Sequence, residues 1–326
     1  NISELSDDEK EALSELLEML EQKKRRNLLR SKYYDAKQTV RHLGIAIPPQ
    51  LQTIETVIGW PAKAVTALDN RTELDGFVVP GGSWSDFGLD VIWDENRLEL
   101  EASQAHVSAF KYAVTFVAVL AGAEGEPDVV VRPLSAMSST ARWDAVRRRV
   151  RDALSVTGVD DAGQLSEFIL YTADHIVTCT RTDAVWAVER RAHSLRRAPV
   201  AVLPYKPDLE HPFGKSRISR AVMSITDRAV RSLLRMEVSA EFYSAPQRYV
   251  LGADEDSFVG PDGEPRTGWE VTVGKLLALG VNDEDEKPSV GQFPQMTMQP
   301  HMDMVRSDAA LFAGETGIPV SSLGII

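Results

Sequence analysis

The sequence predicts an α+β fold, with helices toward both ends of the chain and antiparallel strands between them. Two observations support this fold class. Apolar residues recur every three or four positions near the N-terminus and again over residues 214–243, which is the period of an amphipathic helix. Between these regions, short runs of β-branched and apolar residues alternate with turn-forming residues, as in an antiparallel meander.

A long helix is predicted over residues 7–43. Ser6 is its expected N-cap, and Glu9 three residues later completes a capping box. Gly44, followed by two prolines, is expected to end it. A second helical stretch covers 51–67 and is interrupted near Trp60.

The middle of the chain predicts a sheet. A helix over 101–112 leads into a buried strand over 114–120, and a partner strand over 129–132 is expected to end at Pro133. The basic stretch 144–154 is predicted to be helical. Successive strands of a meander are predicted over 167–171, 175–181 and 184–190, followed by a proline-rich connector over 199–212.

After Gly214 a single helix is predicted to run to Tyr243 and to stop before Pro246, spanning about 45 Å. Its apolar stripe consists of Ile218, Val222, Ile225, Ala229, Leu233, Met236, Ala240 and Tyr243. Residues 247–293 are predicted to form short strands and turns, and another helix is predicted over 296–312.

The charge of the chain is negative overall and unevenly distributed. There are 36 basic and 48 acidic residues, for a net charge of −12, which argues against a simple duplex-DNA binder. Residues 214–250 hold seven basic and three acidic residues, whereas 251–290 hold three basic and ten acidic ones. This contrast indicates either complementary subunit surfaces or two solvated faces.

No catalytic set or cofactor site emerges from the motifs. Gly214-Lys215-Ser216 resembles the end of a phosphate-binding loop, but Leu209 stands where the loop needs glycine and Pro212 lacks an N–H group. The six histidines are scattered, and the single cysteine, Cys179, excludes both an intrachain disulfide and a thiolate zinc site. We therefore expect no metal, no cofactor and no enzymatic activity.

Several segments, taken in order, resemble the portal (head-to-tail connector) protein of tailed double-stranded DNA phages, in the branch typical of siphophages and actinobacterial prophages. These segments are GKSRISRAV at 214–222, AEFYSAPQRYVLG at 240–252, VGQFPQMTMQPH at 290–301 and LFAGETGIPVSSLG at 311–324. The N-terminal helix, with its paired tyrosines at 33–34, is similar as well.

The resemblance implies a portal fold with an α/β wing, long stem helices and a small α/β clip insertion. The implied segments are the wing at 1–212, the first stem helix at 213–246, the clip at 247–294, the second stem helix at 295–313 and the start of the tunnel loop at 314–326. The rest of the tunnel loop, the following wing helix and the crown are expected to be absent, and both ends of the chain are expected to be truncated.

The function implied by the resemblance is a ring-shaped channel at the capsid vertex, through which DNA is packaged and ejected. A cyclic homo-oligomer, typically a dodecamer, is expected to dock the terminase subunits and the head-completion proteins, and to contact the major capsid and scaffolding proteins. The expected location is the virion, after assembly in the cytoplasm of a bacterial host. No membrane and no sequence-specific DNA contact is expected. The alternatives are a phage-associated hydrolase and a DNA-binding module.

Three groups of residues are functional candidates under this resemblance. Candidates for intersubunit contacts or for the channel wall on the first stem helix are Arg220, Arg228, Arg231 and Arg235. The candidate acidic surface of the clip is Asp283, Glu284, Asp285 and Glu286. The candidate start of the tunnel loop is Gly317, Ile318 and Pro319.

Overall fold

The computed structural model describes residues 2, 4–39, 56–183, 185–243, 248–251, 289–292 and 297–324. The chain divides into two compact units: the first comprises Asn1–Thr39, Val57–Thr226 and Leu311–Ile326, and the second comprises Val40–Thr56 and Asp227–Ala310. Two of the unit boundaries, after Thr226 and after Ala310, lie inside the helices α5 and α7. The segments expected from the sequence instead begin and end at helix termini. The wing, stem, clip and tunnel-loop segments therefore stay predictions.

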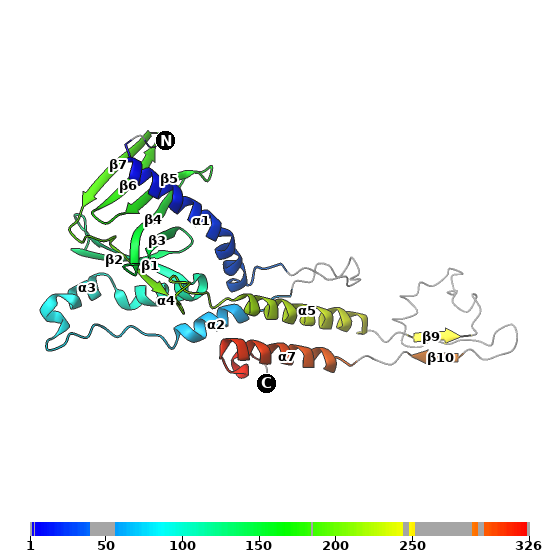
Figure 1. The fold of residues 1–326 in the computed structure, drawn as a ribbon. Helices are drawn as coiled ribbons and strands as arrows, with labels where there is room; N and C mark the ends of the chain where they lie inside the picture. The colour runs from blue at the N-terminus through cyan, green and yellow to red at the C-terminus, as the bar shows by residue number, and fades with distance from the viewer. Residues whose placement is uncertain are drawn as a thin grey trace. The chain divides into compact units, whose positions relative to one another are not determined.

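The first unit begins with helices and continues into strands (Figure 1). Its helices before the sheets are α1 (Asp7–Tyr34), α2 (Trp60–Asp69), the 3₁₀ turn η2 (Trp84–Phe87), α3 (Leu89–Glu95) and α4 (Leu98–Tyr112). Its strands are β1 (Val114–Ala121), β2 (Val129–Ser135), β3 (Ser139–Asp144), β4 (Arg149–Val159), β5 (Leu165–Tyr171), β6 (His175–Thr182), β7 (Val185–Ala192) and β8 (Val200–Pro204). The later elements are α5 (Arg220–Tyr243), β9 (Arg248–Leu251), β10 (Ser289–Gln292), α7 (Gln299–Thr316) and the 3₁₀ turn η4 (Val320–Leu323).

The capping box predicted at the start of α1 is confirmed. The Glu9 N–H donates to Ser6 Oγ at 3.2 Å, and the Glu9 carboxylate accepts from the Ser6 N–H at 2.7 Å. The helix ends at Tyr34 and not near residue 43, because Ala36 takes a left-handed conformation with φ 53° that the helix cannot continue through. The glycine and prolines expected to end it lie outside the described residues.

The strands of the first unit form two antiparallel sheets. The five-stranded sheet has the order β3-β4-β5-β6-β7, and the three-stranded sheet has the order β2-β1-β8. The meander predicted over 167–190 is confirmed as β5, β6 and β7. With the helices, these sheets confirm the predicted α+β class.

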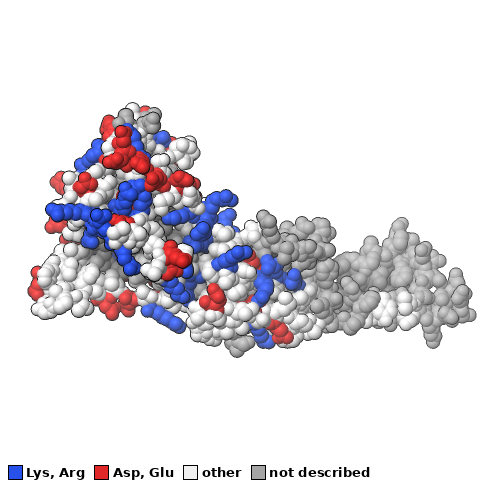
Figure 2. All heavy atoms as spheres, in the orientation of Figure 1, with Lys and Arg blue, Asp and Glu red and all other residues white. Residues whose placement is uncertain are grey.

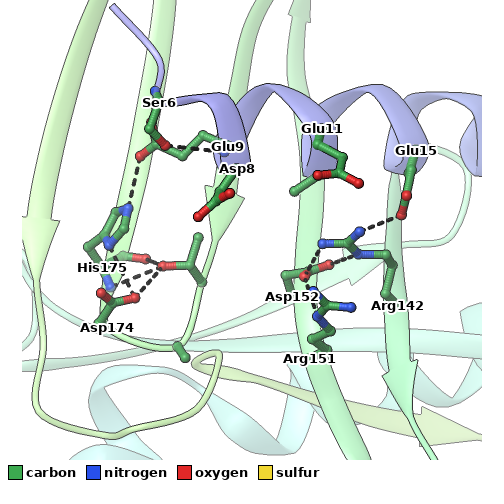
Figure 3. Close-up of a pocket in the computed structure, with 13 residues that line it drawn as sticks. Ser6, Asp8, Glu9, Glu11, Glu15, Arg142, Arg151, Asp152, Asp174 and His175 are labelled. Atoms are coloured by element: carbon green, nitrogen blue, oxygen red, sulfur yellow. Dashed lines mark hydrogen bonds and ion pairs between the residues drawn. The ribbon is translucent and has the colours of Figure 1, made fainter.

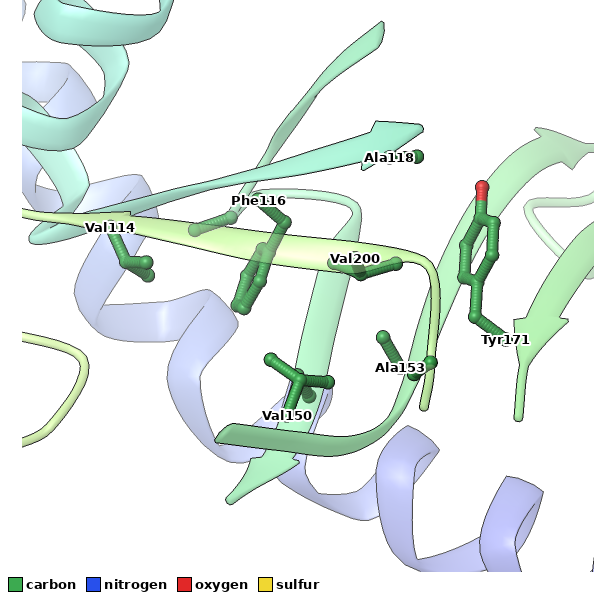
Figure 4. Close-up of a cluster of buried hydrophobic side chains, with 10 residues drawn as sticks. Val114, Phe116, Ala118, Val150, Ala153, Tyr171 and Val200 are labelled. Carbon is green, nitrogen blue, oxygen red and sulfur yellow. The ribbon is translucent and has the colours of Figure 1, made fainter. Parts of the chain in front are cut away.

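Alternate residues of the five-stranded sheet serve two different cores. Ala153 of β4 and Tyr171 of β5 face the three-stranded sheet, where they pack with Phe116 of β1 and Val200 of β8 (Figure 4). The neighbouring residues point to the opposite face and pack beneath α1; this second cluster contains Leu13, Leu16, Leu154, Phe168, Leu170, Val177 and Cys179. The two-residue period of the strands thus builds a layered body from α1 and the two sheets.

The stretch 144–154, predicted to be helical, is instead a hairpin between β3 and β4. Asp144 makes the turn, because its Oδ1 accepts from the N–H groups of Val146 at 3.0 Å and Arg147 at 2.9 Å. Arg148 then adopts a φ of 50°, which a helix excludes. The run of arginines indicated a helix, but β4 is a strand because its apolar residues are buried on both faces of the sheet.

Two further strand predictions differ from the structure at prolines. β2 continues through Pro133 to Ser135; it is an edge strand, so the missing N–H of proline disrupts no inner ladder. Part of the expected proline-rich connector is β8, which pairs with β1 through Val114–Ala118. The apolar run that precedes Pro204 is the signal for this strand.

A buried carboxylate, Glu9, joins the start of α1 to the five-stranded sheet. Its Oε1 lies 2.9 Å from His175 Nε2, as Figure 3 shows, and its Oε2 accepts from Arg190 Nη2 at 2.8 Å. The hydrogen bonds from Arg190 are the largest cause that lowers the pKa of Glu9 from 4.5 to about 2. Burial opposes this shift, and hydrogen bonds with Ser6 and His175 add to it. Glu9 and His175 line a groove between α1 and the sheet. This groove holds a second ion pair, in which Arg142 donates to Asp152 at 2.7 Å.

Glu9→Gln is expected to lower the free energy of unfolding by about 2–3 kcal/mol at pH 7. Lowering the pKa of Glu9 from 4.5 to about 2 corresponds to about 3 kcal/mol, and solvent screening at the partly exposed Arg190 reduces this value. Because the folded-state pKa is depressed, this contribution is complete above pH 4.5 and disappears as the pH falls toward 2. Urea unfolding at several pH values measures the difference.

Glu11→Gln is the matched control, because Glu11 lies in the same groove, is exposed and has no ion pair among the described residues. We expect it to change stability by less than about 0.5 kcal/mol. Equal effects of the two variants, or a Glu9→Gln effect that persists unchanged to pH 2.5, would contradict the assignment.

Candidate functional site

Arg217 lies in the loop before α5 and connects four elements of the first unit. Its guanidinium donates to the carbonyl of Ala64 in α2 at 2.6 Å, to the hydroxyl of Tyr205 at 3.0 Å and to the carbonyl of Thr316 at the end of α7 at 2.7 Å. Its main-chain N–H donates to Phe110 of α4 at 2.8 Å. This one residue therefore fixes both where α5 begins and where α7 ends.

The Gly214-Lys215-Ser216 motif has a structural role in the same loop. Gly214 adopts a φ of 74°, and a Cβ there would lie 2.3 Å from the carbonyl oxygen of Tyr205. Lys215 pairs with Asp208 at 2.6 Å, and Ser216 Oγ donates at 2.7 Å to a carbonyl at the end of α4. The lysine and the hydroxyl that a phosphate would need are thus both occupied by neighbouring groups of the chain.

The helix α5 begins at Arg220, six residues after the predicted start at Gly214. Ser219 provides the cap, since its Oγ accepts from the N–H of Val222 at 3.1 Å. The helix has 24 residues and is about 36 Å long, shorter than the 45 Å expected. The difference arises because Ser216 and Arg217 bond to other elements and cannot form a helical turn.

The buried side of α5 differs from the predicted stripe at several positions from Ile225 onward. Ile225, Leu233 and Met236 are only partly buried. The buried positions follow a spacing of four, namely Val222, Thr226, Val230, Leu234 and Val238, with Ala229 and Ser232 beside them. Residues four apart form the ridge that most often packs between helices, and this ridge rotates gradually around the helix axis.

In the second unit, α5 pairs with α7 through a buried carboxylate. Asp308, whose side chain is 4% exposed, accepts a hydrogen bond and ion pair from Arg228. Ser232 Oγ lies 3.4 Å from the other oxygen of Asp308, and farther along Ser239 Oγ lies 3.4 Å from His301 Nε2. Residue numbers rise along α5 as they fall along α7, so these segments are antiparallel. Asp308 was not predicted from the sequence, because a single acidic residue in a helix forms no recognisable motif.

The four candidate arginines lie within one arc of α5, and the buried ridge passes beside this arc at Leu234 and Val238. At 100° per residue, Arg220, Arg231 and Arg235 fall within about 60° of one another, and Arg228 extends the arc to about 80°. Within the part of the chain that the structure describes, only Arg228 of the four has an ion pair. Their assignment to the channel wall or to subunit contacts stays a prediction.

The candidate tunnel-loop residues lie at the end of α7. The helix, predicted over 296–312, runs from Gln299 through Gly314 and stops at Thr316. Gly317 has a φ of 69° and its N–H donates to the carbonyl of Ala313 at 2.7 Å, a left-handed helix end. Ile318 is buried and Pro319 is exposed. A role for these residues in a tunnel loop stays a prediction.

Only two short strands are described from the predicted clip. β9 and β10 pair antiparallel, from Arg248 opposite Gln292 to Leu251 opposite Ser289. The candidate acidic surface, Asp283, Glu284, Asp285 and Glu286, lies outside the described residues.

The described residues hold no evident metal site, reactive thiol or membrane span. Among them, no cluster of three or more His, Cys, Asp or Glu is placed to bind a metal ion. Burial raises the pKa of the Cys179 thiol to about 11, so it is protonated at neutral pH. None of the helices in the described ranges combines the length and apolarity that a bilayer crossing requires.

Comparison with known proteins identifies the family. Residues 13–325 match the model of a family described as "Phage portal protein, SPP1 Gp6-like". The chain belongs to this portal family. The portal proteins of Mycobacterium phages L5 and D29 are each 26% identical to it, over 297 and 300 residues. These alignments cover 88% of this chain but 60% of each phage portal protein, so the chain spans less than two thirds of their length.

Solved structures give a weaker likeness to this portal-family chain. The neck of an empty gene transfer agent particle is 14% identical over 87% of this chain and 69% of that one, with a TM-score of 0.44. The virion of the native particle is 13% identical over 82% and 66%, with a TM-score of 0.43. TM-scores this low do not establish a shared fold, so the family assignment depends on the sequence match alone.

Arg217→Lys is expected to lower the free energy of unfolding by about 2–3 kcal/mol, because a single ammonium cannot reach the three acceptors that the guanidinium fork joins. Arg220→Lys is the control: this arginine is three residues away, exposed and has no ion pair among the described residues, so we expect a change below about 0.5 kcal/mol. Chemical denaturation measures both, and similar losses would refute a joining role for Arg217.

Gly214→Ala and Gly317→Ala form a second matched pair. Both glycines have positive φ, so each substitution carries a backbone cost of about 1–2 kcal/mol. Only at Gly214 does the new Cβ collide with main-chain oxygen, whereas nothing lies within 4 Å at Gly317. We expect Gly214→Ala to cost at least about 2 kcal/mol more by thermal unfolding; equal costs would contradict the close approach to Tyr205.

Proposed function

We propose that the protein is the portal subunit of a phage or prophage, and forms a ring-shaped channel at one capsid vertex through which double-stranded DNA is packaged and ejected. The observation that carries this proposal is the family match, which extends over residues 13–325 and includes both helices, α5 and α7. The portal proteins of two mycobacteriophages support it through 26% identity across most of the chain.

The proposed assembly is a closed ring, with twelve subunits as the expected number. Contacts in a cyclic ring are heterologous, so each subunit presents two different surfaces that must fit one another. A basic face on α5, in which Arg220, Arg231 and Arg235 have no ion pair among the described residues, is suited to acidic groups on a neighbouring subunit. We assign these arginines, with Arg228, to the stem of the ring.

The proposed mechanism is that of a mechanical conduit and not of an enzyme. DNA must slide through the ring, and an acidic chain of net charge −12 binds a polyanion weakly. Gly214, Lys215 and Ser216 are engaged with their own chain, which favours a structural role over nucleotide binding. ATP hydrolysis is accordingly assigned to the terminase.

The proposed partners follow from this role. The clip, with Asp283, Glu284, Asp285 and Glu286, would contact the terminase during packaging and the head-completion proteins afterwards. The wing would contact the major capsid and scaffolding proteins. The protein is placed at the portal vertex of the virion, after assembly in the cytoplasm of a bacterial host, and the residues 317–319 are placed at the start of the tunnel loop.

The size of the particle tests the proposed function. Twelve copies of the 36.0 kDa chain give about 430 kDa, and mass photometry with negative-stain electron microscopy is expected to show rings of that mass. Species no larger than dimers, across protein concentration and salt, would contradict the proposal.

Charge reversal tests the basic face separately. Arg231→Glu combined with Arg235→Glu is expected to reduce the ring fraction at least about tenfold, because buried or partly buried ion pairs across an interface lose their complement. The control is Arg196→Glu combined with Arg197→Glu, two exposed arginines before β8 with the same charge change. If both double variants form rings equally well, the arginine face does not take part in the subunit interface. That outcome would not contradict the ring itself.

A further inference from the structure

A small basic cavity lies in the first unit, between the second half of α1, the strand β3 and the loop that precedes Gly214. Its volume is about 240 Å³. Lys23, Arg26 and Arg30 of α1 line one side, and Thr140 of β3 lines another. In Figure 2 basic side chains gather around this half of α1, whereas acidic ones gather near its start.

The three cations lie on one face of α1 and have no counter-ion in the part of the chain that the structure describes. They are spaced three and four residues apart, which places successive side chains next to one another on a helix. None of them has an ion pair within the described ranges. Burial lowers the pKa of Lys23 and lowers that of Arg30 to about 10, and repulsion from Arg26 contributes to both shifts. Positive charge is thus concentrated here without a neutralising partner among the described residues.

Arg30 is held in place by hydrogen bonds within the chain. Its Nη1 donates to Asn27 Oδ1 and to the carbonyl of Tyr112, each at 3.2 Å, and Asn27 is itself fixed by a hydrogen bond to the carbonyl of Ala136 at 2.9 Å. No acceptor for its Nε or Nη2 is found among the described residues. On the other side, Lys23 lies over the ring of Phe213, 5.3 Å from the centroid.

An unsatisfied hydroxyl provides an independent sign of a missing ligand. Thr140 is 1% exposed, and its Oγ1 has no hydrogen-bond partner among the described residues. A buried hydroxyl without a partner is costly, so native proteins usually satisfy it. Because Thr140 lines the cavity, a ligand oxygen there would supply the missing acceptor.

One acidic side chain also lines the cavity. Glu210 is exposed and forms no ion pair among the described residues. The neighbouring Asp208 is already bound by His211 at 2.8 Å and by Lys215 at 2.6 Å. The three cations of α1 therefore outnumber the acidic groups that face them.

We propose that this cavity binds a phosphate group, held by Lys23, Arg26 and Arg30 and by a hydrogen bond from Thr140. Planar guanidinium groups match the oxygens of phosphate, and three positive charges suit a dianion. The phosphate comes either from solution as inorganic phosphate or from the backbone of nucleic acid. The site is independent of the proposed ring, because every residue that forms it belongs to one subunit.

Isothermal titration of the full chain with sodium phosphate, at ionic strength held constant with sodium chloride, tests the first source. We expect saturable binding in the roughly millimolar range. Arg26→Gln is expected to weaken binding at least about tenfold, and Thr140→Val to weaken it about threefold. The matched control is Arg25→Gln, which removes the same charge from the adjacent exposed residue that does not line the cavity.

The same variants are then titrated with a short blunt-ended DNA duplex to test the second source. Binding of duplex but not of inorganic phosphate, with the same loss in Arg26→Gln, assigns the site to backbone phosphate. Absence of saturable binding to both probes overturns the proposal, and so does binding that Arg26→Gln and Arg25→Gln weaken equally.

A stability measurement shows that the variant is folded. In chloride buffer without phosphate, Arg26→Gln is expected to unfold at the same temperature as the wild type or a few degrees higher, since it relieves repulsion among the cations. A clear fall in its midpoint would mean that Arg26 has a structural partner and would count against the site.

Discussion

The hydrogen bonds of Arg217 are the interaction on which the arrangement of the first unit depends. Helices α2 and α4, the end of α7 and Tyr205 after β8 each bond to this residue. The guanidinium joins α2, Tyr205 and the end of α7 because it presents donors in several directions from one rigid plane, and the main-chain N–H of Arg217 adds the bond to α4. With Ser216 and Gly214 also bound to their surroundings, the chain has no freedom to form a helix until Ser219. The start of α5 is therefore set by tertiary contacts.

The pairing of α5 with α7 in the second unit depends on a different kind of interaction. Asp308 is buried, and a buried carboxylate is tolerated only when it is paired and hydrogen-bonded. Arg228 and Ser232 meet this requirement and thereby fix the register of the two segments. Arg220, Arg231 and Arg235 have no ion pair among the described residues, and we propose that they contact a neighbouring subunit of a ring.

Much of the fold was predictable because local signals and tertiary packing agree. Ser6 and Glu9 form their capping box, and the β5–β7 meander follows its alternation of apolar residues. Prediction was wrong at residues 144–154, where a run of arginines resembled a helical face while Asp144 and Arg148 made a turn. The candidate arginines were named from the resemblance and stay a prediction, whereas the basic cavity was not predicted, since Thr140 and Arg30 come from distant parts of the chain.

The sequence by itself determined the α+β class, the portal resemblance, the amphipathic character of α5 and the absence of a phosphate-binding loop at Gly214. These properties depend on composition, period and short spacings, which are local. The tertiary structure alone decided where α1 ends, where α5 begins, which carboxylate pairs with Arg228, and which cations have no counter-ion among the described residues. Each of these depends on groups that meet only after folding, because burial makes an unpaired charge or hydroxyl costly and so selects its partner.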